Sequence, residues 1–243
     1  LTGLHWCIGK AQLTKRKLVV DCVSHSAFQM QFSRFFSIEG QEFSESYDGC
    51  PVPLEVQVAQ AKFAGTGYTV CDRDVTHVDW DTREEVIVYA GCGNISDLHL
   101  KEIKVVPDIL ALLSNEPKIE GRYVGGHFRN TDLRNDLDTF VQSVQQVLKK
   151  DPGIAILYLA TDDACARAKI ETQLPGVQIV QYTSPQANVP NLHYGCADKY
   201  RQVYECLRDI YFLLMSDEFV PSLNSGLSRL VVKMRRSQFS VFE

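Results

Sequence analysis

The chain has 243 residues, of which 45% are hydrophobic and 23% charged, and its formal net charge is −5 at pH 7. This composition is typical of a globular protein with one large or two smaller domains, and without a basic excess it does not predict a nucleic-acid-binding surface. No apolar run reaches the ~20 residues that cross a bilayer, and the first residues lack a secretory signal, so we predict a cytoplasmic protein without a membrane span. The 8 cysteines form no CxxC pair and no Cys/His metal spacing, which predicts buried free thiols.

Short runs of β-branched and aromatic residues predict strands, and helical stretches separate several of them. In chain order these runs cover residues 17–23, 68–72, 85–90, 122–128, 154–160, 177–182 and 218–223. The clearest helix is expected in residues 135–150, where one apolar stripe recurs at helical spacing: Leu137, Phe140, Val141, Val144 and Val147 or Leu148. Strands that alternate with helices predict an α/β fold with a largely parallel sheet.

A change of character near residues 112–120 separates an irregular N-terminal half from a regular C-terminal half. We therefore predict two α/β lobes, residues 1–115 and 116–243, with a cleft between them. One continuous sheet is the alternative.

Polar side chains gather where three of the predicted strands end. "RYVGG" runs into His127, Arg129 and Asp132, "IAILYLA" into Thr161, Asp162 and Asp163, and "EFVPSL" into Asn224, Ser225 and Gly226. Ligands of parallel α/β sheets sit beyond the carboxyl ends of the strands, so the three clusters predict one ligand site.

Each cluster also has a purely structural interpretation. Thr161 or Asp162, and Asn224 or Ser225, are residue types that cap the N-terminus of a following helix. Arg129 at the end of a buried strand needs an anionic partner, which is either a protein carboxylate or a ligand. Arginine beside a serine-led helix start is a suitable clamp for a diphosphate, because both offer donors to phosphate oxygens.

The segments "HFRNTD", "LYLATDD" and "RDIYFLLMSDEFVPSLNSGLSRL" occur in an order and spacing that resemble the donor-binding domain of the α-1,6-fucosyltransferases. That group includes nodulation-type bacterial enzymes and, more distantly, the protein O-fucosyltransferases. The resemblance is strongest over residues 120–233 and weaker around residues 3–21. It implies a GT-B-like enzyme of two Rossmann-type lobes that transfers fucose from GDP-fucose to a glycan hydroxyl, with inversion and without a metal or other cofactor.

The resemblance also implies roles for individual residues. The donor-binding residues would be His127 and Asp209 at the guanine, Arg129 and Ser225 at the β-phosphate with Gly226 at the helix start, and Gly3 near the pyrophosphate. The carboxylates around the active centre would be Asp132, Asp162 and Asp163, any of which is a candidate general base. A guanidinium and a helix N-terminus would meet the charge that develops on the leaving diphosphate.

Two positions depart from the family pattern. Asn130 stands where a second basic residue is usual, and Leu133 stands where the motif ends in lysine. The acceptor is therefore open; the short chain argues against the core of N-glycans and favours a microbial or viral surface glycan. The alternative to an enzyme is a non-catalytic or different-sugar GDP-sugar-binding module, whereas an oxidoreductase would need a complete GxGxxG fingerprint, which the sequence lacks.

Overall fold

The computed structural model describes residues 4–23, 28–45, 68–71, 86–89, 100–130, 135–185, 197–222, 225–237 and 240–242. The chain divides into two compact units. Unit 1 comprises residues 1–25, 29–106 and 239–243, and unit 2 comprises residues 26–28 and 107–238. This division lies near the boundary predicted after residue 115, while the assignment of donor and acceptor to the two lobes, and a cleft between them, stay predictions.

Unit 1 consists of short elements around aromatic side chains. Its elements are α1 (Leu4–Thr14), the parallel pair β1 (Leu18–Val19) and β3 (Phe43–Ser44), the antiparallel pair β2 (Phe36–Ile38) and β6 (Ile103–Val105), the parallel pair β4 (Tyr68–Cys71) and β5 (Val86–Tyr89), and the 3₁₀ turns η1 (Phe32–Arg34) and η3 (Leu100–Glu102). The rings of Phe32 and Phe36 stack with centroids 5.0 Å apart, and Phe35 beside them is fully buried. The end of the chain joins this unit, because the N–H of Val105 donates to the carbonyl of Val241 at 2.6 Å.

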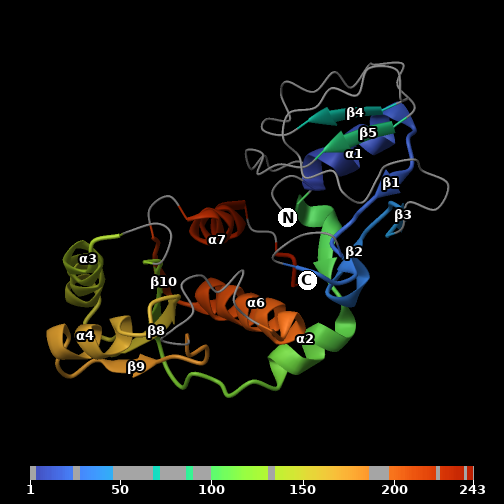
Figure 1. The fold of residues 1–243 in the computed structure, drawn as a ribbon. Helices are drawn as coiled ribbons and strands as arrows, with labels where there is room; N and C mark the ends of the chain where they lie inside the picture. Colours follow the sequence, from blue (N-terminus) through green and yellow to red (C-terminus); the bar gives the residue numbers. More distant parts are fainter. Residues whose placement is uncertain are drawn as a thin grey trace. The chain divides into compact units, whose positions relative to one another are not determined.

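Unit 2 is built on a four-stranded parallel sheet with the strand order β10-β7-β8-β9. The strands are β7 (Tyr123–Phe128), β8 (Ile156–Thr161), β9 (Gln178–Val180) and β10 (Glu218–Val220), and the helices are α2 (Pro107–Ser114), α3 (Leu137–Lys150), α4 (Ala166–Gln173), α6 (Lys199–Met215) and α7 (Gly226–Ser237). In Figure 1, α3 and α4 lie on one side of this sheet, and α6 and α7 lie on the other. Helices on both faces of a parallel sheet make unit 2 a doubly wound α/β unit.

The two glycines of β7 let helices approach both faces of this strand. A Cβ atom at Gly125 would lie 2.8 Å from Ser216 Oγ and 3.1 Å from Leu213 Cδ2, at the end of α6. A Cβ atom at Gly126 would lie 2.8 Å from the ring of Phe140 in α3. All six residues of β7 are buried, so "YVGGHF" combines large residues that fill the core with two that admit the helices.

The predicted secondary structure is confirmed in its main features. Each of the predicted strand runs contains a strand, and α3 lies within residues 135–150, with Asp136 at its N-cap accepting from the N–H of Thr139 at 2.9 Å. The apolar stripe of α3 packs on β7 and β8 in one core with Val124, Leu157 and Leu159. The two- and three-residue strands β2, β3 and β6 were not predicted, since such short strands show no alternation. The described strands form separate sheets, not one continuous sheet.

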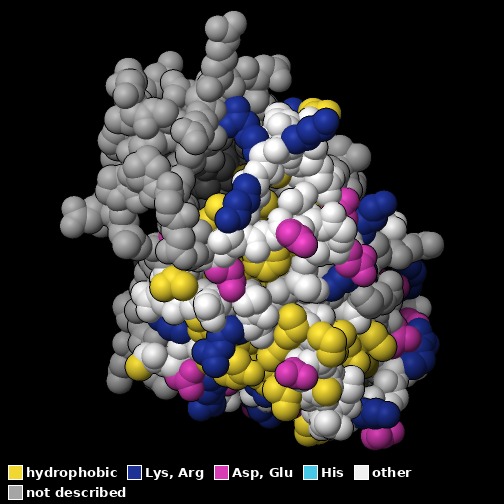
Figure 2. Space-filling view, turned by 90° about the vertical axis from the view of Figure 1, so that its right-hand side faces the viewer, with side chains coloured by type: hydrophobic (Ala, Val, Ile, Leu, Met, Phe, Trp, Pro, Cys, Tyr) yellow, Lys and Arg dark blue, Asp and Glu magenta, His cyan; other side chains and the backbone are white. Residues whose placement is uncertain are grey.

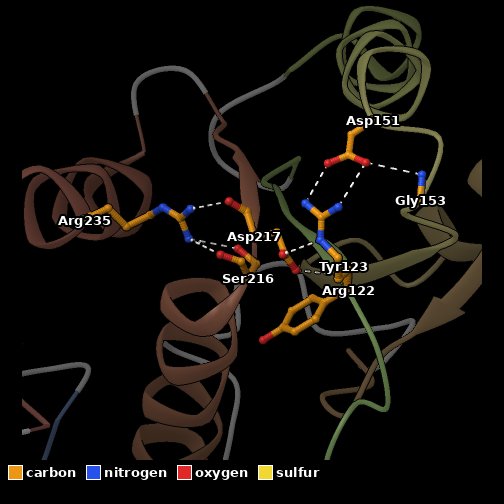
Figure 3. Close-up of polar contacts among 7 residues, drawn as sticks. All are labelled: Arg122, Tyr123, Asp151, Gly153, Ser216, Asp217 and Arg235. Atoms are coloured by element: carbon orange, nitrogen blue, oxygen red, sulfur yellow. Dashed lines mark hydrogen bonds and ion pairs between the residues drawn. The ribbon is translucent and has the colours of Figure 1, made fainter.

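An arginine ties strands together at the amino end of this sheet (Figure 3). Arg122 donates through Nη1 and Nη2 to the two carboxylate oxygens of Asp151, at 3.1 and 2.6 Å, and through Nε to Asp217 at 2.8 Å. The second oxygen of Asp217 accepts from the N–H of Tyr123 at 3.0 Å. The segments before β7, β8 and β10 are thereby joined.

A second arginine closes the end of α6 beside it (Figure 3). Nη1 of Arg235, from the last turn of α7, donates to the carbonyls of Leu213, Leu214 and Ser216 at 3.2, 3.2 and 2.7 Å, and Nη2 donates to the carbonyl of Asp217 at 2.9 Å. These carbonyls at the helix end lack intrahelical partners, and a cation there also complements the helix dipole. We call Arg122, Asp151, Asp217 and Arg235 the amino-end cluster.

The surface of the described residues is mixed. Figure 2 shows hydrophobic side chains gathered in the lower part of one face, and the exposed large hydrophobic residues of unit 2 are Leu112, Tyr200 and Met215. No described helix has the length and apolar character required to cross a bilayer; the cytoplasmic location stays a prediction. The cysteines whose side chains are described lie outside disulfides, as predicted, but the expected burial is wrong: Cys165 and Cys206 are exposed, and Cys7 and Cys22 are partly exposed.

Candidate functional site at the carboxyl end of the unit 2 sheet

The strand order has its topological switch point between β7 and β10. From β7 the chain proceeds through β8 and β9 on one side, and then returns to add β10 on the other side of β7. Connections that leave two adjacent parallel strands in opposite directions open a crevice at the carboxyl ends of those strands, and doubly wound proteins bind ligands there. Arg129 follows β7 directly, and Ser225 lies between β10 and α7.

Hydrogen bonds join the carboxyl ends of β7 and β10 through two buried serines. Ser228, in the first turn of α7, shares a 2.7 Å hydrogen bond with Nδ1 of His127, and its hydroxyl accepts from the N–H of Ser222 at 2.9 Å. The hydroxyl of Ser222 in turn accepts from the N–H of Arg129 at 3.1 Å. His127 of β7 and Arg129, which follows it, are thus fixed relative to the start of α7.

His127 is uncharged at neutral pH. Its burial, with a smaller contribution from the charge of Arg129, lowers its pKa to about 4. Among the described residues the His127 ring is bonded only at Nδ1, and the fully buried side-chain nitrogen and oxygen atoms without a partner are Arg208 Nε and Ser225 Oγ. The Nε2 atom of His127 is therefore not fully buried.

Arg129 lies beside Asp162 without the close geometry of Arg122. The Arg129 side chain is 16% exposed, and its Nε is 3.8 Å from Asp162 Oδ2. That distance exceeds a hydrogen bond. The structural alternative for Arg129, an ion pair within the protein, is therefore present at this longer distance, and Arg129 makes a further interaction within the protein.

The loop after β8 is tied to the loop after β7 by Asn130. Its N–H donates to Asp162 Oδ1 at 2.7 Å, and its side-chain amide donates to Asp163 Oδ2 at 2.9 Å. The other oxygen of Asp163 accepts from the N–H of Cys165 at 2.8 Å. Asn130 therefore organises both aspartates, which gives a physical role to the departure from the family pattern at this position.

The helix-capping interpretation is wrong for the described candidates. Helix α4 begins at Ala166, and neither Thr161 nor Asp162 caps it; Cys165 occupies its N-cap without a side-chain hydrogen bond. Ser225 immediately precedes α7, but its fully buried hydroxyl has no hydrogen-bond partner among the described residues. A buried hydroxyl that neither caps the helix nor bonds elsewhere is an unused donor at a helix N-terminus, where Gly226 adds no side chain.

Asp209 is buried on α6, on the same face of the sheet as His127. Its Oδ1 accepts from Tyr158 Oη at 2.6 Å and from Thr183 Oγ1 at 3.1 Å. Tyr158 of β8 pairs with Gly125, two residues before His127 in β7, so the Cα atoms of Tyr158 and His127 are about 8 Å apart by normal strand spacing. Burial raises the pKa of Asp209 to about 6, against the lowering effect of these two hydrogen bonds.

The fold brings most of the predicted site residues to one region of unit 2. These are His127, Arg129, Asp162, Asp163, Asp209, Ser225 and Gly226. Gly3 and Asp132 lie outside the described residues. The described part of the chain contains no group of three or more His, Cys, Asp or Glu side chains that could hold a metal ion.

Several residues that organise the site were not predicted. Ser222, Ser228, Tyr158 and Thr183 contact site residues through bonds that cross 26 to 101 positions of sequence. No local sequence pattern could reveal such bonds. Tyr158 lies in a strand and Ser228 in the first turn of a helix, whereas Thr183 and Ser222 follow strands, so these residues share no local sequence signal.

Comparison with solved structures reveals relatives of this fold. The chain superposes on fucosyltransferase NodZ from Bradyrhizobium with a TM-score of 0.58 and 18% identity, covering 94% of this chain and 86% of that one. A NodZ α-1,6-fucosyltransferase crystal soaked with GDP-fucose gives 0.56 and 16%, covering 95% and 86%, and one co-crystallised with GDP gives 0.57 and 17%, covering 93% and 86%. No protein-family model and no curated protein sequence matches the chain. The chain therefore has an α/β, GT-B-like fold that is similar to that of NodZ α-1,6-fucosyltransferase, as its motifs predict.

Proposed function

We propose that this protein is an inverting, metal-independent glycosyltransferase that moves fucose from GDP-fucose to a hydroxyl of a glycan acceptor. The observation that carries the proposal is the polar cluster at the switch point of unit 2: Arg129 directly after β7, the start of α7, and the hydroxyl of Ser225, which has no hydrogen-bond partner among the described residues. The solved NodZ structures with GDP-fucose or GDP support this donor, since their fold is similar over most of the chain.

The diphosphate is assigned to the space between the ends of β7 and β10. A guanidinium donates to phosphate oxygens in a forked geometry, and a helix N-terminus adds free N–H groups and partial positive charge. Arg129 supplies the first and α7 the second, with Ser225 Oγ as a further donor. In the transition state, negative charge builds on the leaving GDP, so these fixed donors lower the barrier as the bond to the anomeric carbon breaks.

The base is assigned to the face of the sheet that carries Asp209 and His127. Guanine presents N1–H and an amino group, which a carboxylate accepts, whereas the corresponding edge of adenine lacks N1–H. Asp209 Oδ2 has no hydrogen bond among the described residues, and His127 offers Nε2. Both groups suit a guanine contact.

Transfer forms a bond from the acceptor oxygen to the anomeric carbon, and the acceptor proton goes to a base. Asp163 is the least suited of the described candidates, because both its oxygens already accept protein N–H groups. Asp162 and Asp132 remain the candidates for this base. Gly3 and the N-terminal half of the chain are proposed to complete the donor and acceptor sites.

The test is turnover of GDP-fucose by the purified protein with a panel of glycan acceptors, with and without EDTA. We expect release of GDP, a product with the inverted anomeric configuration, and unchanged activity in EDTA. Activity that is lost on chelation and restored by manganese would make Asp162 and Asp163 metal ligands instead. Tight binding of GDP-fucose without turnover on any acceptor would select the non-catalytic binding module.

A further inference from the structure

The carboxylate of Asp209 is used by the protein on one side only. Both hydrogen bonds that it accepts, from Tyr158 and Thr183, end on Oδ1. Two donors use the lone pairs that one carboxylate oxygen offers in its plane. Oδ2 receives no bond from the described residues and is not among their fully buried unpaired atoms, so it keeps some exposed surface.

The two donors to Oδ1 are themselves held in place. The ring of Tyr158 is fully buried in β8 and lies 5.1 Å from the ring of Phe212 and 5.7 Å from that of Tyr182, centroid to centroid. Thr183 Oγ1 accepts from Arg208 Nη2 at 3.3 Å. Because arginine only donates, this bond directs the hydroxyl proton of Thr183 toward Asp209.

We infer that Tyr158 and Thr183 are positioning residues for recognition of the donor's base: by donating to the same oxygen, they fix the Asp209 carboxylate so that Oδ2 is left to accept from the guanine edge. This inference rests on the proposed function, in which Asp209 reads the base. It adds that the reading depends on two residues that do not touch the nucleotide.

The surroundings of Asp209 make these two bonds important for its charge. Burial raises the pKa of the carboxyl group, while Tyr158, Thr183 and, more weakly, Arg208 lower it, and Glu205 raises it. Arg208 forms its ion pair with Glu116, at 3.1 Å, rather than with Asp209. The charged or titratable neighbours of Asp209 are thus Tyr158 of β8 and, on α6 itself, Glu205, Cys206 and Arg208. Loss of either hydroxyl donor leaves the ionised form less supported.

The decisive variant is Tyr158→Phe, which keeps the ring and removes the donor. GDP dissociation constants are measured calorimetrically from pH 5 to pH 8, and the titration of Asp209 is followed by carboxyl carbon NMR without nucleotide. We expect the pKa of Asp209 to rise by about one unit and the pH below which GDP affinity falls to move up equally, which weakens GDP binding about fivefold at pH 6. The preference of the protein for GDP over ADP should become smaller, because ADP makes no contact with Asp209 that the change could weaken.

Tyr123→Phe is the matched control. Tyr123 is a buried tyrosine of the adjacent strand β7 on the same face, and its hydroxyl donates to the carbonyl of Phe212 at 2.8 Å, away from Asp209. Its GDP profile should superimpose on that of the wild type. If Tyr158→Phe fails to fold, Thr183→Val tests the other donor and should shift the profile in the same direction.

The outcomes separate this inference from the proposed function. A Tyr158→Phe or Thr183→Val protein that is folded and has the wild-type Asp209 titration and GDP profile overturns the positioning role alone. If Asp209→Asn binds GDP as the wild type does, Asp209 does not recognise the base. That result would contradict the proposed donor site itself. A rise in the pKa of Asp209 together with a parallel loss of GDP affinity supports both.

Discussion

The two ends of the unit 2 sheet use the same residue types in opposite ways. At the amino end, Arg122 donates hydrogen bonds to two aspartates, and Arg235 donates to four backbone carbonyls. At the carboxyl end, Arg129 stands 3.8 Å from its aspartate. At that end the groups without a hydrogen-bond partner among the described residues include the buried hydroxyl of Ser225 and the Oδ2 atom of Asp209.

This difference separates polar groups that hold the fold from polar groups kept for a ligand. A buried polar group without a partner costs free energy, so selection removes it unless it has another use. At the amino end, the arginines and aspartates find their hydrogen-bond partners within the protein. Removing one of these side chains should therefore lower stability. At the carboxyl end, Ser225 Oγ and Asp209 Oδ2 have no hydrogen-bond partner among the described residues. Removing these groups should therefore weaken ligand binding.

The largest effect is expected from Arg129→Ala. Transfer should be nearly abolished and GDP affinity should fall about 10- to 100-fold, because hydrogen bonds to a charged ligand are lost. Arg129→Lys should fail almost as badly, since an ammonium group cannot reproduce the forked contact. Calorimetric titration with GDP and circular dichroism melts are run on the same proteins.

Stability decides how the Arg129 result is interpreted. The Ala variant should melt close to the wild type, because Asp162 keeps its bond from Asn130. A strongly destabilised variant would show that the internal pair with Asp162 is the main role of Arg129. A stable variant that binds GDP normally would also contradict the phosphate assignment.

Arg235→Met should have the converse effect. The stem of the side chain is kept, while the carbonyls of Leu213, Leu214, Ser216 and Asp217 lose the hydrogen bonds from Arg235, so the free energy of unfolding should fall by about 1–3 kcal/mol. GDP affinity of the folded protein should be unchanged. Chemical denaturation and GDP titration test both statements, and reduced GDP affinity in this variant would remove the separation between the two ends.

The pH dependence of GDP binding should reveal Asp209. The guanine contact needs the carboxylate, whose pKa is raised to about 6, so affinity should be nearly constant above about pH 7 and fall about eightfold between pH 6.5 and pH 5. The raised pKa also means that the buried charge costs stability above pH 6, a cost that is relieved as the pH falls toward 4. Asp209→Asn should bind GDP weakly at every pH, and a wild-type pH profile in this variant would assign the titration to another group.

Ser225→Ala should have the smallest effect. GDP affinity should fall only a few-fold, the contribution of one neutral hydrogen-bond donor, while stability stays equal or rises because a buried unpaired hydroxyl is removed. Ser228→Ala, one turn along α7, is the stability control, since that hydroxyl bonds to His127 and Ser222 and its loss should destabilise the protein. Comparable destabilisation by both changes would mean that Ser225 is bonded within the fold.

The sequence predicted the architecture of unit 2 better than the details of its site. The spacing of apolar residues, the runs of β-branched residues and the glycines identify β7, β8, β9, β10 and α3. These signals are clear because the elements alternate regularly and bury one continuous core. Strands of two or three residues in unit 1 carry no such signal. Arg129 was identified because a charge at the end of a buried strand requires a partner.

Sequence reasoning reached the polar partners only in part. It offered Thr161, Asp162 and Ser225 as helix caps, although none of them caps a helix, since helix boundaries depend on backbone conformation that composition does not determine. It gave Asn130 no role beyond replacing a basic residue, whereas Asn130 holds two aspartates. The donors to Asp209 come from β8 and from the segment after β9, and only the folded chain brings them together.

The most direct test of the central claim, that the carboxyl end of the unit 2 sheet binds a guanine nucleotide, is a thermal melt of the wild-type protein with a nucleotide panel. A ligand that binds only the native state stabilises it by about 2.7 kcal/mol at a hundredfold excess over its Kd. GDP and GDP-fucose should raise the melting temperature, and ADP, UDP and CDP should leave it unchanged. Equal shifts with all the nucleoside diphosphates, or no shift with GDP, would contradict recognition of guanine by Asp209 and His127.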